Sequence, residues 1–231
     1  MVNLSYLLTI HNEGKSVANL LDRLDHHIRG TNDEVIIIDD YSTDQITIDA
    51  VQKIVKAHPE EYVKVFQHSL NNDYGTHKNY GNSLCKNEWI FQIDGDELPH
   101  TNLLVNIKDI IAENQSVELF FVPRVNDFVG VTPEHALRWG WRLTPCPEYN
   151  NRPVINWPDY QGRIYKNEPS RIKWDRRLHE RIEGHTKFAA FPAEVDFSLY
   201  HDKSIERQIK TNERYNEKFT ESENKGHGVF K

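Results

Sequence analysis

Cysteines, long apolar runs and glycine-rich loops are scarce in this chain, and each absence narrows what it can be. Two cysteines, Cys85 and Cys146, are too few for a disulfide framework or for a zinc site of their own. No apolar run reaches the length of a membrane span, so no transmembrane segment is expected. The first residues also lack the basic region of a signal peptide. These features predict a globular, cytoplasmic protein.

Charge and glycine spacing exclude further classes. The formal net charge of −7 disfavours a nucleic-acid-binding surface, so no nucleic-acid partner is expected. The first apolar run is not followed by G-x-G-x-x-G, which disfavours a dinucleotide cofactor. Residues 75–81 lack the Gly-Lys-Ser/Thr ending of a P-loop. A bound nucleotide would therefore have to be held in another way.

The first half of the chain alternates strand and helix patterns. Short apolar runs predict buried strands at residues 4–10, 34–39, 63–67, 89–93 and 117–125. Apolar residues at helical spacing predict helices at residues 17–28, 46–57, 74–85 and 103–111. This alternation predicts an α/β protein with a Rossmann-like, mostly parallel central sheet and helices on both faces.

The second half is less regular. Residues 126–159 are rich in proline and tryptophan and are interpreted as a long irregular insertion. Short strands, partly antiparallel, are expected at residues 161–166, 171–174 and 195–200. Residues 204–219 predict a C-terminal helix, whose charges are interpreted as a solvated face with Glu206 and Lys210 at a favourable spacing. The chain is thus expected to form one domain, with a nucleotide-binding half (1–125), an acceptor-side half (126–202), and a helix and tail (203–231).

Polar side chains follow three of the predicted strands at the point where each ends. They occur at residues 9–13, 39–44 and 94–97. Because ligands of open α/β sheets bind beyond the carboxyl ends of the strands, the three groups are expected to form one site. The alternative is three ordinary turns, in which Asn12, Ser42 or Thr43 caps the helix that follows.

The stretch Asp94-Gly95-Asp96-Glu97 has the most specific chemistry of the three. Two aspartates one residue apart at a strand end suit a divalent cation and the diphosphate that it carries. Mg²⁺ and Mn²⁺ prefer carboxylate oxygens and substrate phosphates as ligands. A nucleotide held through carboxylates and a metal, without a glycine loop, indicates a nucleotide-sugar.

These motifs resemble, in order and spacing, those of family 2 glycosyltransferases, which are inverting enzymes of the GT-A fold. The resemblance is carried by residues 10–13, 36–44, 72–81, 91–97, 160–167, 178–182 and 200–204. The chain departs from the family pattern at His11, where an aromatic residue often stands, and at Tyr41, where glycine is common. The resemblance implies Mn²⁺ or Mg²⁺ as cofactor and a nucleotide-sugar donor, most simply a UDP-sugar. It leaves open a saccharide, a lipid-linked or a protein acceptor.

The resemblance also implies roles for particular residues. Those expected at the nucleotide are Thr9, Asn12, Glu13, Asp39, Asp40, Lys78, Asp94 and Arg163. Asp40 would accept a hydrogen bond from a pyrimidine N–H, and Lys78 and Arg163 would contact phosphate. The expected metal ligands are Asp94, Asp96 and His201.

An inverting transfer needs a general base, and the best candidate is Glu180. Glu97 is the next choice, followed by Glu183 and Asp159. The His179-Glu180 pair does not fit a zinc protease, because position 183, where the second histidine would stand, is Glu.

Tryptophans in the irregular region are candidates for stacking on an acceptor sugar, and these are Trp139, Trp141 and Trp157. Trp174 is expected in the core instead. Two other functions stay open: a sugar-1-phosphate nucleotidyltransferase, although its Gly-rich, Arg-containing loop is missing, and a binding module without catalysis.

Overall fold

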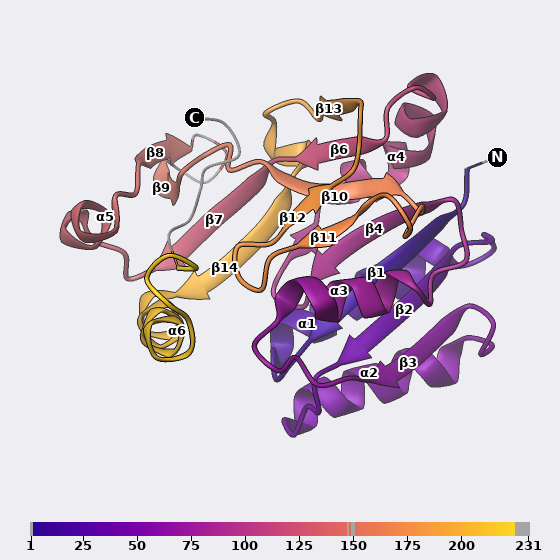
Figure 1. The fold of residues 1–231 in the computed structure, drawn as a ribbon, viewed down its shortest axis with the longest axis horizontal. Coiled ribbons are helices and arrows are strands. Elements are labelled where there is room, and N and C mark those ends of the chain that lie inside the picture. The colour runs from indigo at the N-terminus through magenta and orange to yellow at the C-terminus, as the bar shows by residue number, and fades with distance from the viewer. Residues whose placement is uncertain (1, 147, 149–150, 225–231) are drawn as a thin grey trace.

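A seven-stranded sheet forms the centre of the computed structural model, which describes residues 2–146, 148 and 151–224 (Figure 1). Its order is β13-β6-β10-β4-β1-β2-β3. The four parallel strands are β1 (Leu4–Ile10), β2 (Glu34–Asp39), β3 (Val63–Gln67) and β4 (Trp89–Asp94). β1 and β2 are buried along almost their whole length, as expected of parallel strands that are covered on both faces.

Three later strands extend this sheet beyond β4. They are β6 (Leu119–Val122), β10 (Gln161–Lys166) and β13 (Phe188–Ala190). β10 runs antiparallel to both β4 and β6, and its register shifts between Gly162 and Ile164. The sheet is therefore mostly parallel with one reversed strand, which agrees with the predicted fold class.

Helices cover the two faces unequally. α1 (Lys15–Ile28), α2 (Gln45–Ala57) and α4 (Thr101–Glu113) pack on one face, in a core cluster that includes Tyr6 and Leu8 of β1. The other face carries α3 (Tyr74–Asn82) and a hairpin of β11 (Lys173–Asp175) and β12 (Arg181–Glu183). Trp174 of the hairpin is buried in this second cluster, as predicted.

The region expected to be irregular contains most of a second, five-stranded sheet. Its order is β5 (Leu98–Pro99), β14 (Leu199–Ser204), β7 (Arg124–Val129), β9 (Arg152–Ile155) and β8 (Leu143–Cys146). α5 (Pro133–Trp139) joins β7 to β8, and α6 (Ile205–Lys218) follows β14 (Figure 1). Among the described residues, no helix has the length and apolar character needed to cross a bilayer.

Two strand predictions were wrong in detail. The single strand expected at residues 117–125 is divided at Pro123 into β6 and β7, which belong to different sheets. Proline has no N–H for the strand ladder, so a sheet ends readily there. The strand expected at residues 195–200 begins instead as a 3₁₀ turn, Val195–Phe197, before β14.

Candidate active site

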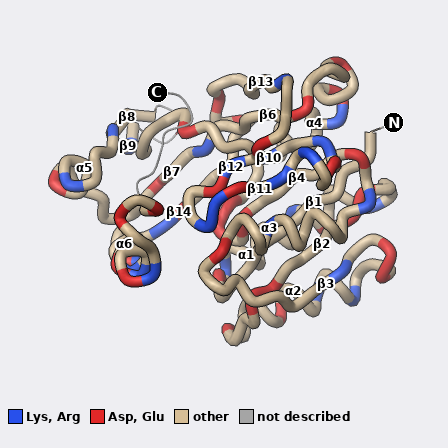
Figure 2. The backbone as a smooth tube through the Cα atoms, in the orientation of Figure 1, with Lys and Arg blue, Asp and Glu red and all other residues tan. Residues whose placement is uncertain are grey.

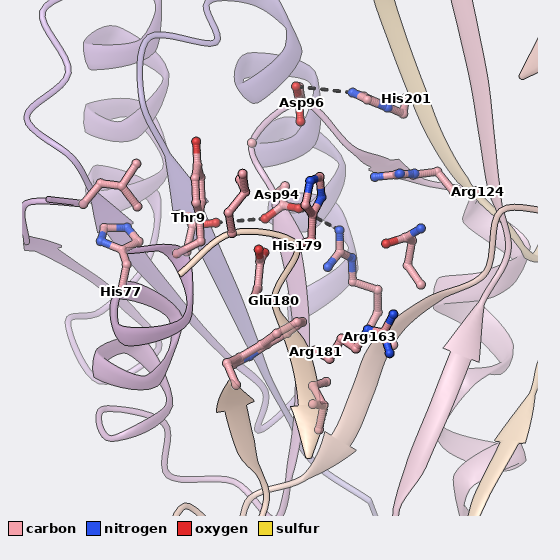
Figure 3. Close-up of a pocket in the computed structure, with 18 of the residues that line it drawn as sticks. Thr9, His77, Asp94, Asp96, Arg124, Arg163, His179, Glu180, Arg181 and His201 are labelled. Carbon is pink, nitrogen blue, oxygen red and sulfur yellow. Dashed lines mark hydrogen bonds and ion pairs between the residues drawn. The ribbon is translucent and has the colours of Figure 1, made fainter. Parts of the chain in front are cut away.

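A cavity of about 800 Å³ opens at the carboxyl ends of β1 and β4 (Figure 3). Its walls come from the first sheet, from α3, from the β11–β12 hairpin and from α6. This volume is typical of small-molecule sites. The residues of the predicted site that line it are Thr9, Glu13, Asp40, Asp94, Asp96, Arg163, Glu180 and His201.

Asp94 lies at the centre of the cavity and is held on several sides. Thr9 Oγ1 donates a hydrogen bond of 3.1 Å to Asp94 Oδ1, and Arg163 Nη2 donates one of 2.7 Å to Oδ2. Lys78 Nζ lies 3.0 Å from Oδ1. Burial by itself raises the pKa of Asp94, but Arg163 and Lys78 lower it more, so the net pKa lies well below its usual range. Asp94 is therefore a fixed anion whose oxygens are largely occupied by protein donors.

Arg163 is buried and bound to carboxylates. Besides Asp94, it donates to Glu97 at 3.0 and 2.6 Å and to Gln92 Oε1 at 2.9 Å. A second arginine, Arg124, bridges Glu97 and Asp159 with hydrogen bonds of 2.9 and 2.8 Å. Glu97 and Asp159, two of the alternative bases, are thus paired with arginine.

Glu180 is brought to the cavity by the loop that precedes β12. Its Oε1 accepts a hydrogen bond of 2.7 Å from Lys78, whose ammonium also lies 4.5 Å from the ring centre of Trp174. The Glu180 side chain is 16% exposed, whereas that of Lys78 is 2% exposed. Lys78 therefore lies beneath the carboxylates, and Glu180 faces the cavity.

Asp96 and His201 form a second pair on the other side of Asp94 (Figure 3). His201 Nε2 lies 3.4 Å from Asp96 Oδ2, and His201 Nδ1 lies 2.8 Å from Asn126 Oδ1. The amide nitrogen of Asn126 donates to Ile155 O and to Asp159, so its oxygen is the acceptor. In the neutral tautomer that this contact selects, the proton is on Nδ1, and Nε2, which faces Asp96, can offer a lone pair to a cation.

This pair suits a divalent cation, since the imidazole is oriented by a neighbouring amide, as metal-ligating histidines usually are. Within the described part of the chain, no group of three or more His, Cys, Asp or Glu side chains is arranged to hold a metal. Mg²⁺ and Mn²⁺ sites commonly use one or two protein ligands together with substrate phosphates and water. The residues present therefore fit a metal that arrives with a diphosphate.

Three predicted nucleotide residues lie outside the cavity lining: Lys78, described above, and Asn12 and Asp39, which support a turn. Asn12 Oδ1 accepts hydrogen bonds from the backbone N–H groups of Thr43 and Asp44, and Asp39 accepts from Ser42. Both fix the turn after β2. Asp40 does line the cavity, where its Oδ1 accepts from the N–H of Leu70 at 3.0 Å.

Glu13 lies between the end of β1 and Asp96. Its Oε2 accepts a hydrogen bond of 2.6 Å from the N–H of His11. Burial raises its pKa to about 7, and the nearby Asp96 adds to the rise. Glu13 thus exchanges its proton near neutral pH.

Several lining residues were not predicted from the sequence. His77 lies with its Nδ1 3.1 Å from Nδ1 of His68, and burial lowers its pKa to about 4, so it is neutral in this pocket. Tyr74 and Arg124 also line the cavity. Basic residues of β14 and α6 form one wall, and these are Lys203, Arg207, Lys210 and Arg214. The spacing of three and four residues from Arg207 to Lys210 and Arg214 was visible in the sequence as one face of a helix, whereas Lys203 precedes the helix on β14.

The three candidate tryptophans are not among the residues that line the cavity. The rings of Trp139 and Trp141 pack on each other with centres 4.6 Å apart, and Trp157 packs against the apolar core of the second sheet. Contact with an acceptor therefore stays a prediction for them.

Comparison with known proteins gives the family. The family model described as Glycosyl transferase family 2 matches residues 5–165. The chain belongs to this family. Its members are glycosyltransferases, and the matched segment contains β1 to β10 with Asp40, Asp94 and Asp96.

Solved structures show the same fold at low sequence identity. The structure of S. aureus TarS 1–349 is 17% identical with a TM-score of 0.57, and the match covers 87% of this chain and 60% of that one. TarS 1–349 in complex with UDP-GlcNAc gives 17% identity and a TM-score of 0.59, with coverages of 87% and 59%. The chain thus spans about 60% of these structures. A comparison with curated proteins finds no significant match.

Proposed function

We propose that this family 2 glycosyltransferase is a metal-dependent, inverting enzyme that moves a sugar from a nucleotide-sugar, most simply a UDP-sugar, to an acceptor hydroxyl. The observation that carries the proposal is the arrangement of one cavity, in which the Asp96–His201 pair and the Glu180 carboxylate lie on either side of Asp94. The leaving diphosphate needs a group that stabilises its negative charge, and the attacking hydroxyl needs a base that takes its proton. The solved TarS complex with UDP-GlcNAc supports a nucleotide-sugar in this fold.

The donor nucleotide would extend along the ends of β1, β2 and β4. Asp40 would accept from a pyrimidine N–H, while Thr9, Glu13 and Asp94, which also line the cavity, would face the ribose. Asn12 and Asp39 act through the turn that they hold. Lys78 and Arg163, which were expected at phosphate, act by fixing Asp94, since both are already bound to it.

Asp96 and His201 would hold Mn²⁺ or Mg²⁺, with Asp94 contributing through a metal-bound water. When bound, the metal neutralises the charge that develops on the departing diphosphate. Asn126 holds the His201 ring so that Nε2 faces Asp96. The ring would therefore not need to reorient to bind a cation.

Glu180 would act as the general base. The acceptor hydroxyl gives its proton to Glu180 as its oxygen attacks the anomeric carbon. The bond from that carbon to the diphosphate breaks on the opposite face, and the electron pair leaves with the diphosphate. Lys78 pairs with the ionised carboxylate and holds it against the cavity wall.

The acceptor is a saccharide, a lipid-linked sugar or a protein. Trp139, Trp141 and Trp157 lie outside the cavity lining. We therefore expect them to touch only an acceptor that extends past the cavity onto the second sheet.

A thermal-shift panel of UDP, GDP, CDP and dTDP, each with and without Mn²⁺, tests the proposal first. A ligand at a hundred times its dissociation constant adds about 2.7 kcal/mol to the free energy of unfolding. We expect a shift with one nucleotide that grows with Mn²⁺, and release of that nucleoside diphosphate from the matching nucleotide-sugar. Pyrophosphate formation from a nucleoside triphosphate would indicate a nucleotidyltransferase instead. Binding without turnover of any donor would indicate a binding module.

A further inference from the structure

A row of basic side chains runs along the cavity-facing side of α6 and the end of β14. Its members, which we call the α6 row, are Lys203, Arg207, Lys210 and Arg214. The acidic residues of α6 that do not line the cavity are Glu206, Glu213 and Glu217. Basic and acidic positions both occur around this helix (Figure 2), but only the basic ones face the cavity.

Among the described residues, the side chains of the α6 row donate one hydrogen bond, from Arg214 to the hydroxyl of Tyr74. None of them makes an ion pair with an acidic side chain in the part of the chain that the structure describes, and the expected Glu206–Lys210 pair is not formed there. Arg207 and Lys210 are exposed. In a chain of net charge −7, unpaired cations gathered on one wall of a cavity create a local positive field that attracts an anion.

The first half of the α6 row belongs with the diphosphate. Lys203 follows His201 by two residues on β14, so its side chain leaves the strand on the same side. Arg207 acts electrostatically on Glu13, which lies near Asp96. Lys203 and Arg207 therefore stand beside the proposed metal pair.

The second half of the row lies beside the proposed base. Arg214 Nη2 donates a hydrogen bond of 2.8 Å to the hydroxyl of Tyr74. The ring of Tyr215, the next residue, lies 6.4 Å from that of His179, which precedes Glu180. Arg207 and Arg214 are two helical turns apart, or about 10 Å along the axis. The row thus continues well past the metal pair toward Glu180.

We propose that Lys210 and Arg214 form a second anion-binding site, distinct from the diphosphate site. It would bind a carboxylate or phosphate that is carried by the acceptor or by the transferred sugar. This inference rests on the proposed function. Guanidinium groups bind such anions through paired hydrogen bonds, and an ammonium adds a mobile point charge.

Binding measurements with matched neutral and anionic ligands test this site in two arms. In the donor arm, UDP-glucose and UDP-glucuronate are titrated into the protein with Mn²⁺. In the acceptor arm, glucose and glucose 6-phosphate are titrated into protein saturated with UDP and Mn²⁺. Each arm is repeated with Lys210→Gln and with the control Lys218→Gln, which removes a charge from the same helix outside the cavity lining.

We expect the anionic ligand to bind about tenfold more tightly than its neutral partner in one arm, which then identifies the molecule that carries the anion. Lys210→Gln should remove most of this preference and leave the dissociation constant of UDP unchanged, and Lys218→Gln should keep the preference. If the anionic and the neutral ligand bound equally in both arms while UDP still bound, the second anion-binding site would be overturned and the proposed function would stand. Weaker UDP binding by Lys210→Gln would assign the whole row to the diphosphate and also overturn it. If none of the four nucleoside diphosphates of the thermal-shift panel bound, the proposed function would fail, and this inference with it.

Discussion

The ammonium group of Lys78 lies 2.7 Å from the carboxylate of Glu180, although 102 residues separate them in the chain. The same group lies 3.0 Å from Asp94. One buried cation therefore connects the proposed base to the centre of the donor site. Removing this one nitrogen would therefore leave both carboxylates without a shared partner, although Asp94 keeps its contacts with Thr9 and Arg163.

Glu180→Gln tests the base directly. The amide keeps the size of the side chain but cannot accept a proton, so we expect transfer to fall by about 10²–10⁴-fold. The dissociation constant of UDP with Mn²⁺ should stay close to that of the wild type. Product formation and nucleotide titration measure the two quantities. A variant that loses UDP binding instead would move the base elsewhere in the cavity.

Lys78→Met tests whether the buried ammonium beside Glu180 contributes both to stability and to activity. Removing the buried ammonium leaves Glu180 without its partner, so the free energy of unfolding should fall by roughly 3–5 kcal/mol and transfer should be lost. Urea unfolding and turnover measure both effects. The matched control is Lys53→Met, which breaks the exposed pair with Asp22 and should cost less than about 1 kcal/mol. Equal losses in the two variants would contradict the anchoring role of Lys78.

Asp96→Asn tests the metal site. We expect metal-stimulated turnover to fall by about 100-fold or more while the thermal midpoint without nucleotide hardly changes. A chelator should slow the wild-type enzyme to a similar rate and have little further effect on the variant. Turnover by the variant that still responds to Mn²⁺ as the wild type does would place the metal elsewhere.

Glu13 predicts a pH dependence of stability. Its folded-state pKa of about 7 lies above the ordinary value of 4.5, so between these values the folded state holds a proton that the unfolded state has released. This group therefore lowers the free energy of unfolding as pH rises from about 4.5 to 7, by at most about 3 kcal/mol. Urea unfolding from pH 5 to 8 should show this fall in the wild type and a flatter profile in Glu13→Gln. Identical profiles would refute the raised pKa.

Gly75→Ala tests how α3 positions the loop that carries Glu180. A Cβ atom at this position would lie 2.4 Å from the backbone oxygen of Arg176, so the loop must move. We expect turnover to fall by about 10–100-fold with little change in UDP affinity, because a shift of about 1 Å is enough to misplace a catalytic group. Gly30→Ala is the control, since its Cβ meets no atom within 4 Å and only its positive φ adds strain. If Gly75→Ala turned over normally, the loop would not need this contact.

The sequence predicted β1, β2 and β4 of the first sheet well because these strands are mostly apolar, whereas the short edge strand β13 was not predicted. β1, β2 and β3 have the expected bounds, and β4 ends one residue later than predicted. The second sheet was missed because β7 places Asn126 and Asp127 between apolar Val125 and Phe128, and such a mixed pattern does not identify a buried strand.

The structure brings several of the predicted site residues to one cavity, but their contacts with one another were not predicted. Arg163 and Lys78 were expected to reach outward to phosphate, yet both are buried among carboxylates from distant parts of the chain. Nothing local in the sequence distinguishes a buried arginine from an exposed one, since its burial depends on partners such as Glu97, 66 residues away. The helical spacing of the basic residues of α6 could be seen in the sequence. The sequence did not show which face of α6 lines the cavity.

The position of β14 in the second sheet has a consequence for the order in which the protein is made. β14 lies between β5 and β7, and it is synthesised after every other described strand. Until it emerges from the ribosome, β5 and β7 each leave a strand edge unpaired, and Asp96 lacks the neighbouring imidazole. Open strand edges invite pairing with other chains. A polypeptide cut short before Leu199 would therefore be expected to aggregate as well as to be inactive.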